Sequence, residues 1–561
     1  MKKTIALALA LLMCLSVFAA CGGGGGGSTA QPSSQPSSQP SSQPSGASPA
    51  APPTSGGGSQ QQIDQGTAHQ VDPGIEITEE TRYYEELTVI QDNTKTPIID
   101  PHNTASSSSS NHVVFNIVHD RLVQRKVDGY EPGLAVSWDS DDLQHYTFNL
   151  RPDVVFHNGE KFKADDVAFT IDRVMEIGTG TNAYTKWSGV ESYEIVNDLT
   201  IKLNLKALNV DFIKDLSEPY MGILNRKACE ADSENGAQIG TGPFSVDTFV
   251  SNEYGVYVAN MNYWNDLPIT KKITIKFVAE ETARLIALQN NEADIVFSIN
   301  PVHFSELDAN PNFMTFAYTV NNPIMVTFNT NDPLMDDINF RKAVMYALYR
   351  PDIVMAARDG YGTEPVGGMF WGYGTEFKNE AIPRIEYDPD LAKQFLAESS
   401  YNGQTVEIAT AIVDISAGAQ IVQQQLESIG IKTSMYQTDP PGMTAYTTWG
   451  SNQSQIVVFV GGWTNTASSS RAWFYPGNTV NRASLNDPEI NALLDLAPTL
   501  VDEKEREAAY KKVQELVAEK YVYYLVYWTN HVVASQNGVG GLILHADAFH
   551  DFTYIYRIIE D

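Results

Sequence analysis

The sequence contains a glycine-rich segment of the kind that can bind a nucleotide, and we first ask whether it or any catalytic motif is complete. Gly240-Thr-Gly242 has the first two glycines of a dinucleotide-binding turn, but the third is missing, and Pro243 leads into a strand where a helix N-terminus is needed. The His-Glu-x-x-His, Gly-x-Ser-x-Gly and Walker A signatures are absent. Because catalytic carboxylate pairs can be hundreds of residues apart, a secreted hydrolase stays open as an alternative. The sequence favours a protein that is not an enzyme.

Residues that could bind metal ions are also poorly placed. The acidic turn around Asp141 lacks the glycine and the closing Glu of a calcium loop, so a hairpin turn is the better interpretation. His545 and His550 have no third ligand near them in the sequence. Two of the three cysteines lie at the extreme N-terminus, and we expect the third, Cys229, to be a small buried apolar residue. The sequence predicts no metal site, and we expect no cofactor.

The composition excludes nucleic acid as the default partner. The 561 residues include 68 Asp and Glu against 37 Lys and Arg, which gives a net charge of −31. This charge repels a phosphate backbone, and no Lys/Arg-rich run tracks one. The 42% of hydrophobic residues predict a sizeable core.

The N-terminus has the pattern of a secretory signal. Lys2 and Lys3 precede the apolar run Ile5–Leu15, which is too short to span a bilayer. Phe18-Ala-Ala-Cys21 resembles a lipobox, so we expect Cys21 to be lipidated; an ordinary signal peptide cleaved near residue 20 is the alternative. A diacylated cysteine would hold the protein on the outer face of the cell membrane, as on a Gram-positive-type surface.

A polar segment follows the cysteine. Residues 22–59 contain only Gly, Ser, Thr, Ala, Gln and Pro, which cannot bury apolar surface, so we expect a disordered tether that spans about 35 Å as a coil. The folded body is predicted to begin near Thr81.

The first part of the body is predicted to be rich in strands. Alternating residues in Ala135–Val155 predict two strands joined by the acidic turn, and Asp165 opens a helix with Val167, Ile171 and Val174 on one face. Further strands are predicted at 200–205, 244–249, 254–260 and 273–278.

After Asn321 the pattern changes to alternating strands and helices. Strands are predicted at 324–329, 406–411, 431–436 and 456–460, and helices at 340–349, from Pro351, at 419–429 and from Asp502. The segment 406–436 is a predicted β-α-β unit. The last predicted strands, 521–533 and 554–559, indicate that the chain returns to the first lobe at its end.

Nine short segments, in order over nearly the whole body, resemble the family 5 extracellular solute-binding proteins of ABC importers, the dipeptide, oligopeptide and nickel-binding group. They are Tyr130–Trp138, Tyr146–Gly159, Ala164–Val167, Gly240–Phe244, Asn262–Trp264, Arg284–Asp294, Phe328–Thr330, Arg341–Ala343 and Tyr387–Pro389. The resemblance implies an α/β, two-lobed periplasmic-binding-protein-like fold of type II, cluster C, with mixed sheets and a two-segment hinge. We therefore expect a signal peptide at 1–20, the lipidated cysteine and tether at 21–80, lobe I at 81–321 plus 526–561, and lobe II at 322–525.

The resemblance also implies where ligand binds. In the family's peptide binders a Trp after the buried strand is followed, three positions on, by an Asp that pairs with the ligand's α-ammonium. Here Trp463 is retained and Thr466 stands in the Asp position, with Arg471 a few residues further on. A solvated Ser-rich loop is the alternative for this segment.

Three other residues are candidates for the same cleft. Trp371 could form a second aromatic wall or be a core residue. The hydroxyl of Tyr527 could reach the cleft where the chain returns to lobe I. Ser108, in the run Ser106–Ser110, could border the cleft or lie in a surface loop.

Together these observations predict the lipid-anchored binding component of an ABC importer, a monomer that captures short peptides between closing lobes and delivers them to a membrane permease. An oligosaccharide ligand is the alternative within the same fold, because aromatic rings stack on sugar faces and hydroxyls bond their edges.

Overall fold

The computed structural model describes residues 69–559, apart from 79, 93–96, 104–108, 127–128, 179–180, 369, 373–374, 412–414, 451, 464–465 and 546–549. The predicted signal peptide, Cys21, residues 22–68 of the predicted tether and Ser108 lie outside the described residues. The folded body begins earlier than the predicted Thr81, because β1 (His69–Gln70) pairs with β20 (Ile543–Leu544) and Val71 is buried. In the part of the chain that is described, no helix is long and apolar enough to cross a membrane.

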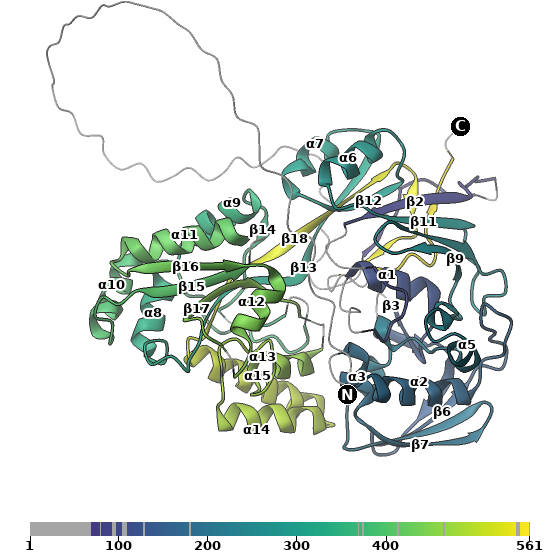
Figure 1. The fold of residues 1–561 in the computed structure, drawn as a ribbon, viewed down its shortest axis with the longest axis horizontal. Helices are drawn as coiled ribbons and strands as arrows, with labels where there is room; N and C mark the ends of the chain where they lie inside the picture. The colour runs from purple at the N-terminus through teal and green to yellow at the C-terminus, as the bar shows by residue number, and fades with distance from the viewer. Residues whose placement is uncertain are drawn as a thin grey trace, which may run out of the picture. The chain divides into compact units, whose positions relative to one another are not determined.

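One mixed sheet of eleven strands runs through the body (Figure 1). Its order is β16 (Thr433–Thr438), β15 (Val406–Ala411), β17 (Ile456–Val460), β13 (Phe313–Phe328), β18 (Tyr523–Gln536), β12 (Ile295–Ile299), β2 (Glu86–Gln91), β11 (Lys272–Phe277), β10 (Tyr254–Ala259) and β9 (Phe244–Val250). β14 (Gly362–Thr363) pairs with β18 beside this path. The sheet therefore contains strands from early and late parts of the chain.

A second, four-stranded sheet belongs to the early part of the chain. Its antiparallel order is β5 (Ala135–Asp139), β6 (His145–Leu150), β8 (Thr200–Leu205) and β7 (Val190–Asn197). The buried residues Val167, Ile171 and Val174 of α2 (Ala164–Ile177) join Phe148 and Leu203 of this sheet in one core. The predicted hairpin and the apolar face of the following helix are confirmed.

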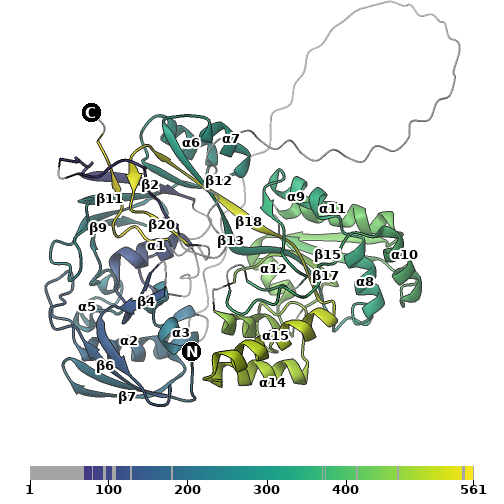
Figure 2. The same ribbon diagram turned by 180° about the vertical axis from the view of Figure 1, so that it is seen from behind.

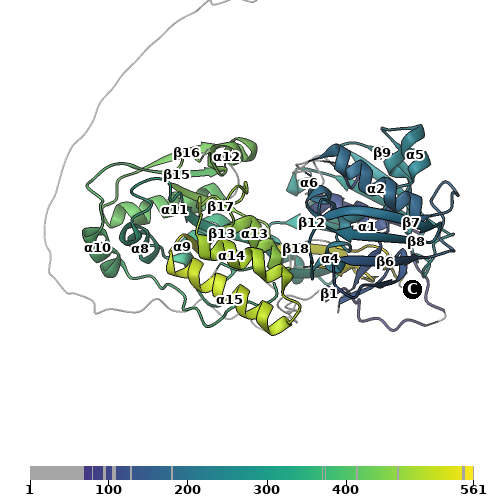
Figure 3. The same cartoon turned by 90° about the horizontal axis from the view of Figure 1, so that it is seen from below.

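Two groups of helices pack on the two faces of β13, β15 and β17 (Figure 2). One face carries α8 (Ile338–Tyr346), α9 (Arg350–Arg358), α10 (Pro389–Glu398) and α11 (Ile415–Ser428). The other carries α12 (Pro440–Thr447), α13 (Ser470–Phe474), α14 (Pro488–Leu496) and α15 (Glu503–Glu519), of which α14 and α15 lie together in Figure 3. Because both faces are covered, Ile456–Phe459 can be apolar at every position.

The remaining elements of the described chain are short. The helices are α1 (Ser109–Val118), α3 (Asn182–Trp187), α4 (Phe212–Asp215), α5 (Arg226–Ala231), α6 (Glu281–Gln289) and α7 (Phe304–Asp308). The strands are β1 (His69–Gln70), β3 (Val123–Lys126), β4 (Gly129–Pro132), β19 (Val539–Gly540), β20 (Ile543–Leu544) and β21 (Tyr556–Arg557), and the 3-10 turns are η1 (Pro219–Met221), η2 (Gly236–Gln238), η3 (Pro301–His303), η4 (Ala467–Ser469) and η5 (Ala497–Thr499).

Two long antiparallel strands, β13 and β18, connect the two ends of the large sheet. The Phe313–Thr319 part of β13 pairs with the second half of β18, which also pairs with β12. Beyond a register shift between Thr319 and Pro323, β13 pairs with the first half of β18 and with β17. The return of the chain predicted at its end is thus made by β18.

The structure corrects some of the expected element limits. The predicted strand 324–329 is the second half of the 16-residue strand β13, because Asn321-Asn322-Pro323, a turn signal in the sequence, is accommodated as a bulge. The predicted strand 554–559 is reduced to β21 with a single bridge between Tyr83 and Ile558. The β-α-β unit is confirmed, since β15 and β16 pair in parallel around α11. The predicted lobe limits stay a prediction.

Candidate functional site

The carboxyl ends of three parallel strands meet at one edge of the large sheet. β15 pairs in parallel with both β16 and β17, so these strands end at Ala411, Thr438 and Val460 on the same side. In open α/β sheets, ligands bind outside the carboxyl ends of the strands. The segment that follows β17, which contains Trp463 and Thr466, is therefore a candidate binding segment.

Backbone hydrogen bonds hold this segment to the middle of β13, where β13 and β18 pass from one end of the large sheet to the other. The Gly461 amide donates to the Pro323 carbonyl at 3.0 Å, and the Trp463 amide donates to the Asn321 carbonyl at 2.9 Å. On the other side of β13, the Thr529 hydroxyl of β18 donates to the Asn322 carbonyl at 2.9 Å. A change in the backbone conformation of β13 at Asn321–Pro323 would therefore move the segment that contains Trp463.

Trp463 and Trp371 lie in one aromatic cluster, which we define as Phe370, Trp371, Trp463, Trp473 and Phe474. The ring centroids of Trp463 and Trp371 are 5.3 Å apart, and Phe370 meets Trp463 edge to face at 4.8 Å. Trp371 is fully buried and its indole N–H donates to the Glu376 carbonyl at 2.9 Å, while the buried Trp463 Nε1 has no hydrogen-bond partner among the described residues. The sequence-predicted aromatic residues are together, with their rings packed against one another.

Thr466 and Arg471 follow on the same segment but in different surroundings. Thr466 is buried and precedes η4, and its carbonyl accepts a bond from the Ser469 hydroxyl at 2.7 Å. The half-exposed Arg471 of α13 stacks on Tyr475 and donates to the Asp495 carboxylate of α14 at 2.6 Å. The charge of Arg471 is therefore already paired within the protein. Its predicted role in ligand binding stays a prediction.

Tyr527 lies on the opposite face of the sheet from the aromatic cluster. Ile324 is opposite Tyr527 and Met325 is opposite Leu525, so the pairing skips one residue of β18 at this point. Tyr527 packs among the α8, α9 and α11 side chains, and its ring is so close to Gly362 that an added Cβ would come within 2.5 Å of Cδ2. The fold gives Tyr527 a packing role; its predicted contact with ligand stays a prediction.

Two contacts that the sequence does not signal join α4 and the residues just before it to the later part of the chain. The Lys214 ammonium of α4 forms an ion pair with the Glu376 carboxylate, and the Val210 amide donates to the Pro498 carbonyl at 3.3 Å. Although burial lowers the pKa of Lys214, the Asp211 and Glu376 carboxylates raise it overall. Lys and Glu are ordinary surface residues, so no sequence pattern marks this pair.

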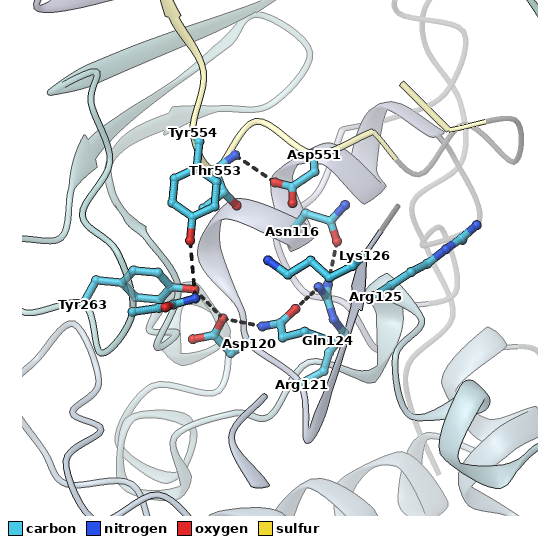
Figure 4. Close-up of a pocket in the computed structure, with 11 residues that line it drawn as sticks. Asn116, Asp120, Arg121, Gln124, Arg125, Lys126, Tyr263, Asp551, Thr553 and Tyr554 are labelled. Atoms are coloured by element: carbon cyan, nitrogen blue, oxygen red, sulfur yellow. Dashed lines mark hydrogen bonds between the residues drawn. The ribbon is translucent and has the colours of Figure 1, made fainter. Parts of the chain in front are cut away.

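A polar network in the early part of the chain surrounds Asp120 (Figure 4). Its carboxylate accepts bonds from Trp264, Tyr263, Thr241 and Gln124, and burial raises its pKa. The adjoining cavity has a volume of about 20 Å³, which is room for about one water molecule. We interpret this network as structural.

The glycine turns and histidines rejected as chemical motifs have packing roles. A Cβ on Gly240 would lie 1.8 Å from the Val118 carbonyl oxygen, so this glycine permits close backbone contact. The His550 ring accepts the His545 amide at 3.1 Å. Among the described residues, no group of three or more His, Cys, Asp or Glu side chains could hold a metal ion. Cys229 is buried, and burial raises the pKa of its thiol to about 11.

Comparison with known proteins shows the protein family to which the chain belongs. Residues 129–484 match the bacterial extracellular solute-binding proteins, family 5, middle region. Heme-binding protein A of Haemophilus influenzae is 28% identical over 446 residues, which cover 71% of this chain and 79% of that protein. The nickel-binding periplasmic protein of Escherichia coli is 25% identical over 464 residues, with 76% and 86% covered.

A solved structure shows the same fold. The ABC transporter-associated periplasmic binding protein DppA of Helicobacter pylori, in complex with the peptide STSA, matches with a TM-score of 0.70 at 23% identity, over 85% of this chain and 98% of that chain. The mixed α/β fold is that of the cluster C periplasmic binding proteins. The chain belongs to the bacterial extracellular solute-binding proteins of family 5, and this family membership makes it a non-enzymatic substrate-binding protein of an ABC importer.

Proposed function

We propose that this protein captures short peptides between its two lobes and presents them to a membrane permease. The observation that carries the proposal is the position of the Trp463 segment: it follows the carboxyl end of β17 and is bonded to β13 at the crossing between the lobes. A ligand seated there touches the place where the lobes hinge, so binding and closure are coupled.

Several observations support peptides over other solutes. Peptide backbones carry regularly spaced donors and acceptors, which a strand edge and loops can bind for many sequences. The relative DppA was solved with a peptide. Relatives named for heme and nickel make these the competing ligand classes. An oligosaccharide is the second candidate because of the hydroxyls of the segment Ser468–Ser470, although the indole rings of Trp463 and Trp473 are buried and stack on each other, 5.6 Å apart.

We further propose that Cys21 anchors the protein to the outer face of the membrane. The lipobox-like Phe18–Cys21 and the polar segment that follows support this proposal. The tether would let the binding body reach a permease in the same membrane.

Native mass spectrometry of the purified protein tests the peptide proposal. We expect bound species whose masses, after release, fragment into amino-acid residues. Released hexose series would instead favour the oligosaccharide, and an iron porphyrin or nickel complex would contradict the peptide proposal.

A further inference from the structure

A second cavity, remote from the candidate binding segment, lies where the ladder of β13 and β18 ends. Its volume is about 340 Å³, and the residues that line it include Tyr84, Asn291, Phe313, Gln536, Asn537 and Arg557. Phe313 and Gln536 are opposite each other at the end of this ladder. Asn321, which bonds the Trp463 segment, follows Phe313 by eight residues on β13, or roughly 27 Å of extended strand. The cavity is therefore separate from the candidate binding segment.

Gln536 is held so that one of its two polar atoms stays open. It is 6% exposed, and its Nε2 donates to the Leu288 carbonyl at 2.6 Å and to the Ala293 carbonyl at 3.2 Å. Because both neighbours are acceptors, the nitrogen must face them, and Oε1 has no hydrogen-bond partner among the described residues. The buried Gln514 instead uses both ends, since its Oε1 also accepts the Asn379 amide at 2.7 Å. Gln536 thus keeps a fixed acceptor at the cavity.

Three neighbouring side chains of the cavity are oriented in the same way. The Asn537 Nδ2 donates to the Pro311 carbonyl, which leaves Oδ1 as an open acceptor. The Asn291 Oδ1 accepts Arg557 Nη1 at 3.0 Å, which leaves the Asn291 Nδ2 and the Arg557 Nη2 as open donors among the described residues. The charge of Arg557 is already paired with the Asp294 carboxylate at 2.7 Å. The lining thus combines fixed donors and fixed acceptors without an unpaired charge.

This combination restricts the chemistry of a ligand. An anion needs donors and a cation needs acceptors, whereas a hydroxyl group both donates and accepts from one atom. The Tyr84 side chain is 39% exposed, and its ring lies 4.8 Å from the Arg557 guanidinium carbon. It therefore offers an aromatic surface beside the open polar groups, as a sugar ring requires for stacking. The cavity is near the lower end of the range of about 300–1,000 Å³ for small-molecule sites.

We propose that this cavity binds a small neutral saccharide of one or two rings. Its hydroxyls would pair with the open atoms of Gln536, Asn537, Asn291 and Arg557, and one sugar face would lie against Tyr84. The protein has already oriented these groups, so little conformational entropy is lost when a ligand binds them. This proposal goes beyond the proposed function, because the site and its ligand are separate from the captured solute.

Calorimetry of the full-length wild type with maltose, cellobiose and N,N′-diacetylchitobiose tests the proposal. We expect at least one of these neutral disaccharides to bind with a Kd of about 1 mM or tighter. Saturating N-acetyl-tetra-alanine amide should leave this binding unchanged, since the two sites are separate. Absence of binding by all three sugars would overturn the proposal, and so would displacement of the sugar by the peptide, which would place the sugar between the lobes.

Two variants with matched controls locate the binding site of the sugar. Asn291 has φ 58°, a conformation that glycine adopts readily, so Asn291→Gly removes the amide and keeps the backbone. It and Tyr84→Ala should each weaken sugar binding about three- to tenfold, as expected for the loss of one hydrogen bond or one stacking contact. Asn252→Gly, at φ 64°, and Tyr349→Ala, at a side chain 40% exposed, are the controls and should bind like the wild type.

Equal sugar affinity in the wild type and in both cavity variants would overturn the assignment. A capped peptide is the competing occupant of the cavity, because its main chain also carries donors and acceptors. If N-acetyl-tetra-alanine amide binds at two sites per protein and Asn291→Gly loses one of them, the cavity is a peptide site and the saccharide proposal is wrong.

Discussion

Thr466 is the residue whose chemistry bears most directly on how the amino end of a peptide would be bound. In the family's peptide binders the corresponding position, by resemblance, carries an Asp that pairs with the α-ammonium. Thr466 is buried and offers only a neutral hydroxyl. A buried ammonium without a charge partner is unfavourable, so we expect this protein to prefer N-blocked or longer peptides over free-amine peptides.

Calorimetry on matched free-amine and N-acetylated peptides checks this expectation. Thr466→Asp should strengthen binding of the free-amine form by about tenfold or more and leave the acetylated form unchanged or weaker. Thr466→Asn is the control of similar size without the charge, and it should show no such selectivity. A wild type that already binds the free amine more than about tenfold tighter than the acetylated peptide would mean that another acid provides the anchor.

The burial of His157 and His102 predicts that the protein loses stability in acid. The His157 Nδ1 accepts the Gly240 amide at 3.3 Å, and its Nε2 is 2.9 Å from the Gly242 carbonyl, an arrangement that requires a neutral ring. Burial lowers the pKa of both His157 and His102 to about 4, from 6.5 in a solvated chain. Because the unfolded chain then takes up protons more readily than the folded one, stability is complete above pH 6.5 and falls as the pH drops towards 4.

Urea unfolding as a function of pH measures this effect. Each of the two histidines should contribute a loss of about 3 kcal/mol in the free energy of unfolding between pH 6.5 and 4. His157→Gln cannot titrate, so its stability should fall less steeply over this range than that of the wild type. His145→Gln, at an exposed ring on the β5–β6 turn, is the control. Parallel curves for His157→Gln and the wild type would contradict the assignment.

At the scale of elements, the short helix α4 supplies a contact that can hold the lobes together. Lys214 of α4 pairs with Glu376, whose carbonyl is held by the indole of the buried Trp371. The aromatic cluster therefore positions the carboxylate that reaches α4. Both charged side chains are partly exposed, so the pair is worth about 0.2–1 kcal/mol.

Glu376→Gln tests this contact through ligand release and scattering. We expect the peptide to dissociate about two- to fivefold faster, and the radius of gyration with peptide bound to be larger than in the wild type, because one contact of the closed form is lost. Glu386→Gln, which removes a carboxylate paired with Arg384 only two residues away, should behave like the wild type. Identical release rates in all three proteins would show that the pair plays no part in closure.

At the scale of the whole molecule, the proposed lipid anchor at Cys21 and the polar segment 22–59 determine the location of the protein in the cell. If Cys21 is diacylated, Cys21→Ser should move the protein from the membrane fraction into the medium, because two acyl chains are needed for stable anchoring. Immunoblots of cell fractions measure the distribution, and Ser28→Ala in the polar segment is a control that should stay with the membrane. Retention of Cys21→Ser on the membrane would exclude the lipid anchor.

The sequence by itself determined the elements and the class. The alternating pattern of Ala135–Val155, the apolar run Ile456–Val460 and the cap at Asp502 are local signals, because each element is specified by the spacing of its own side chains. The capping Asp502 carboxylate accepts the amides of Lys504 and Glu505 at 3.0 Å, as the sequence led us to expect.

Only the tertiary structure decided which side chains meet. The Asn321-Asn322-Pro323 segment looks like a turn in the sequence because its partner strand β18 is remote; Thr529, which bonds Asn322, is 207 residues away. Pairing with that strand makes the segment part of β13. The shift in pairing that places Tyr527 on the far face of the sheet, and the pairing of Lys214 with Glu376, are likewise set by distant partners.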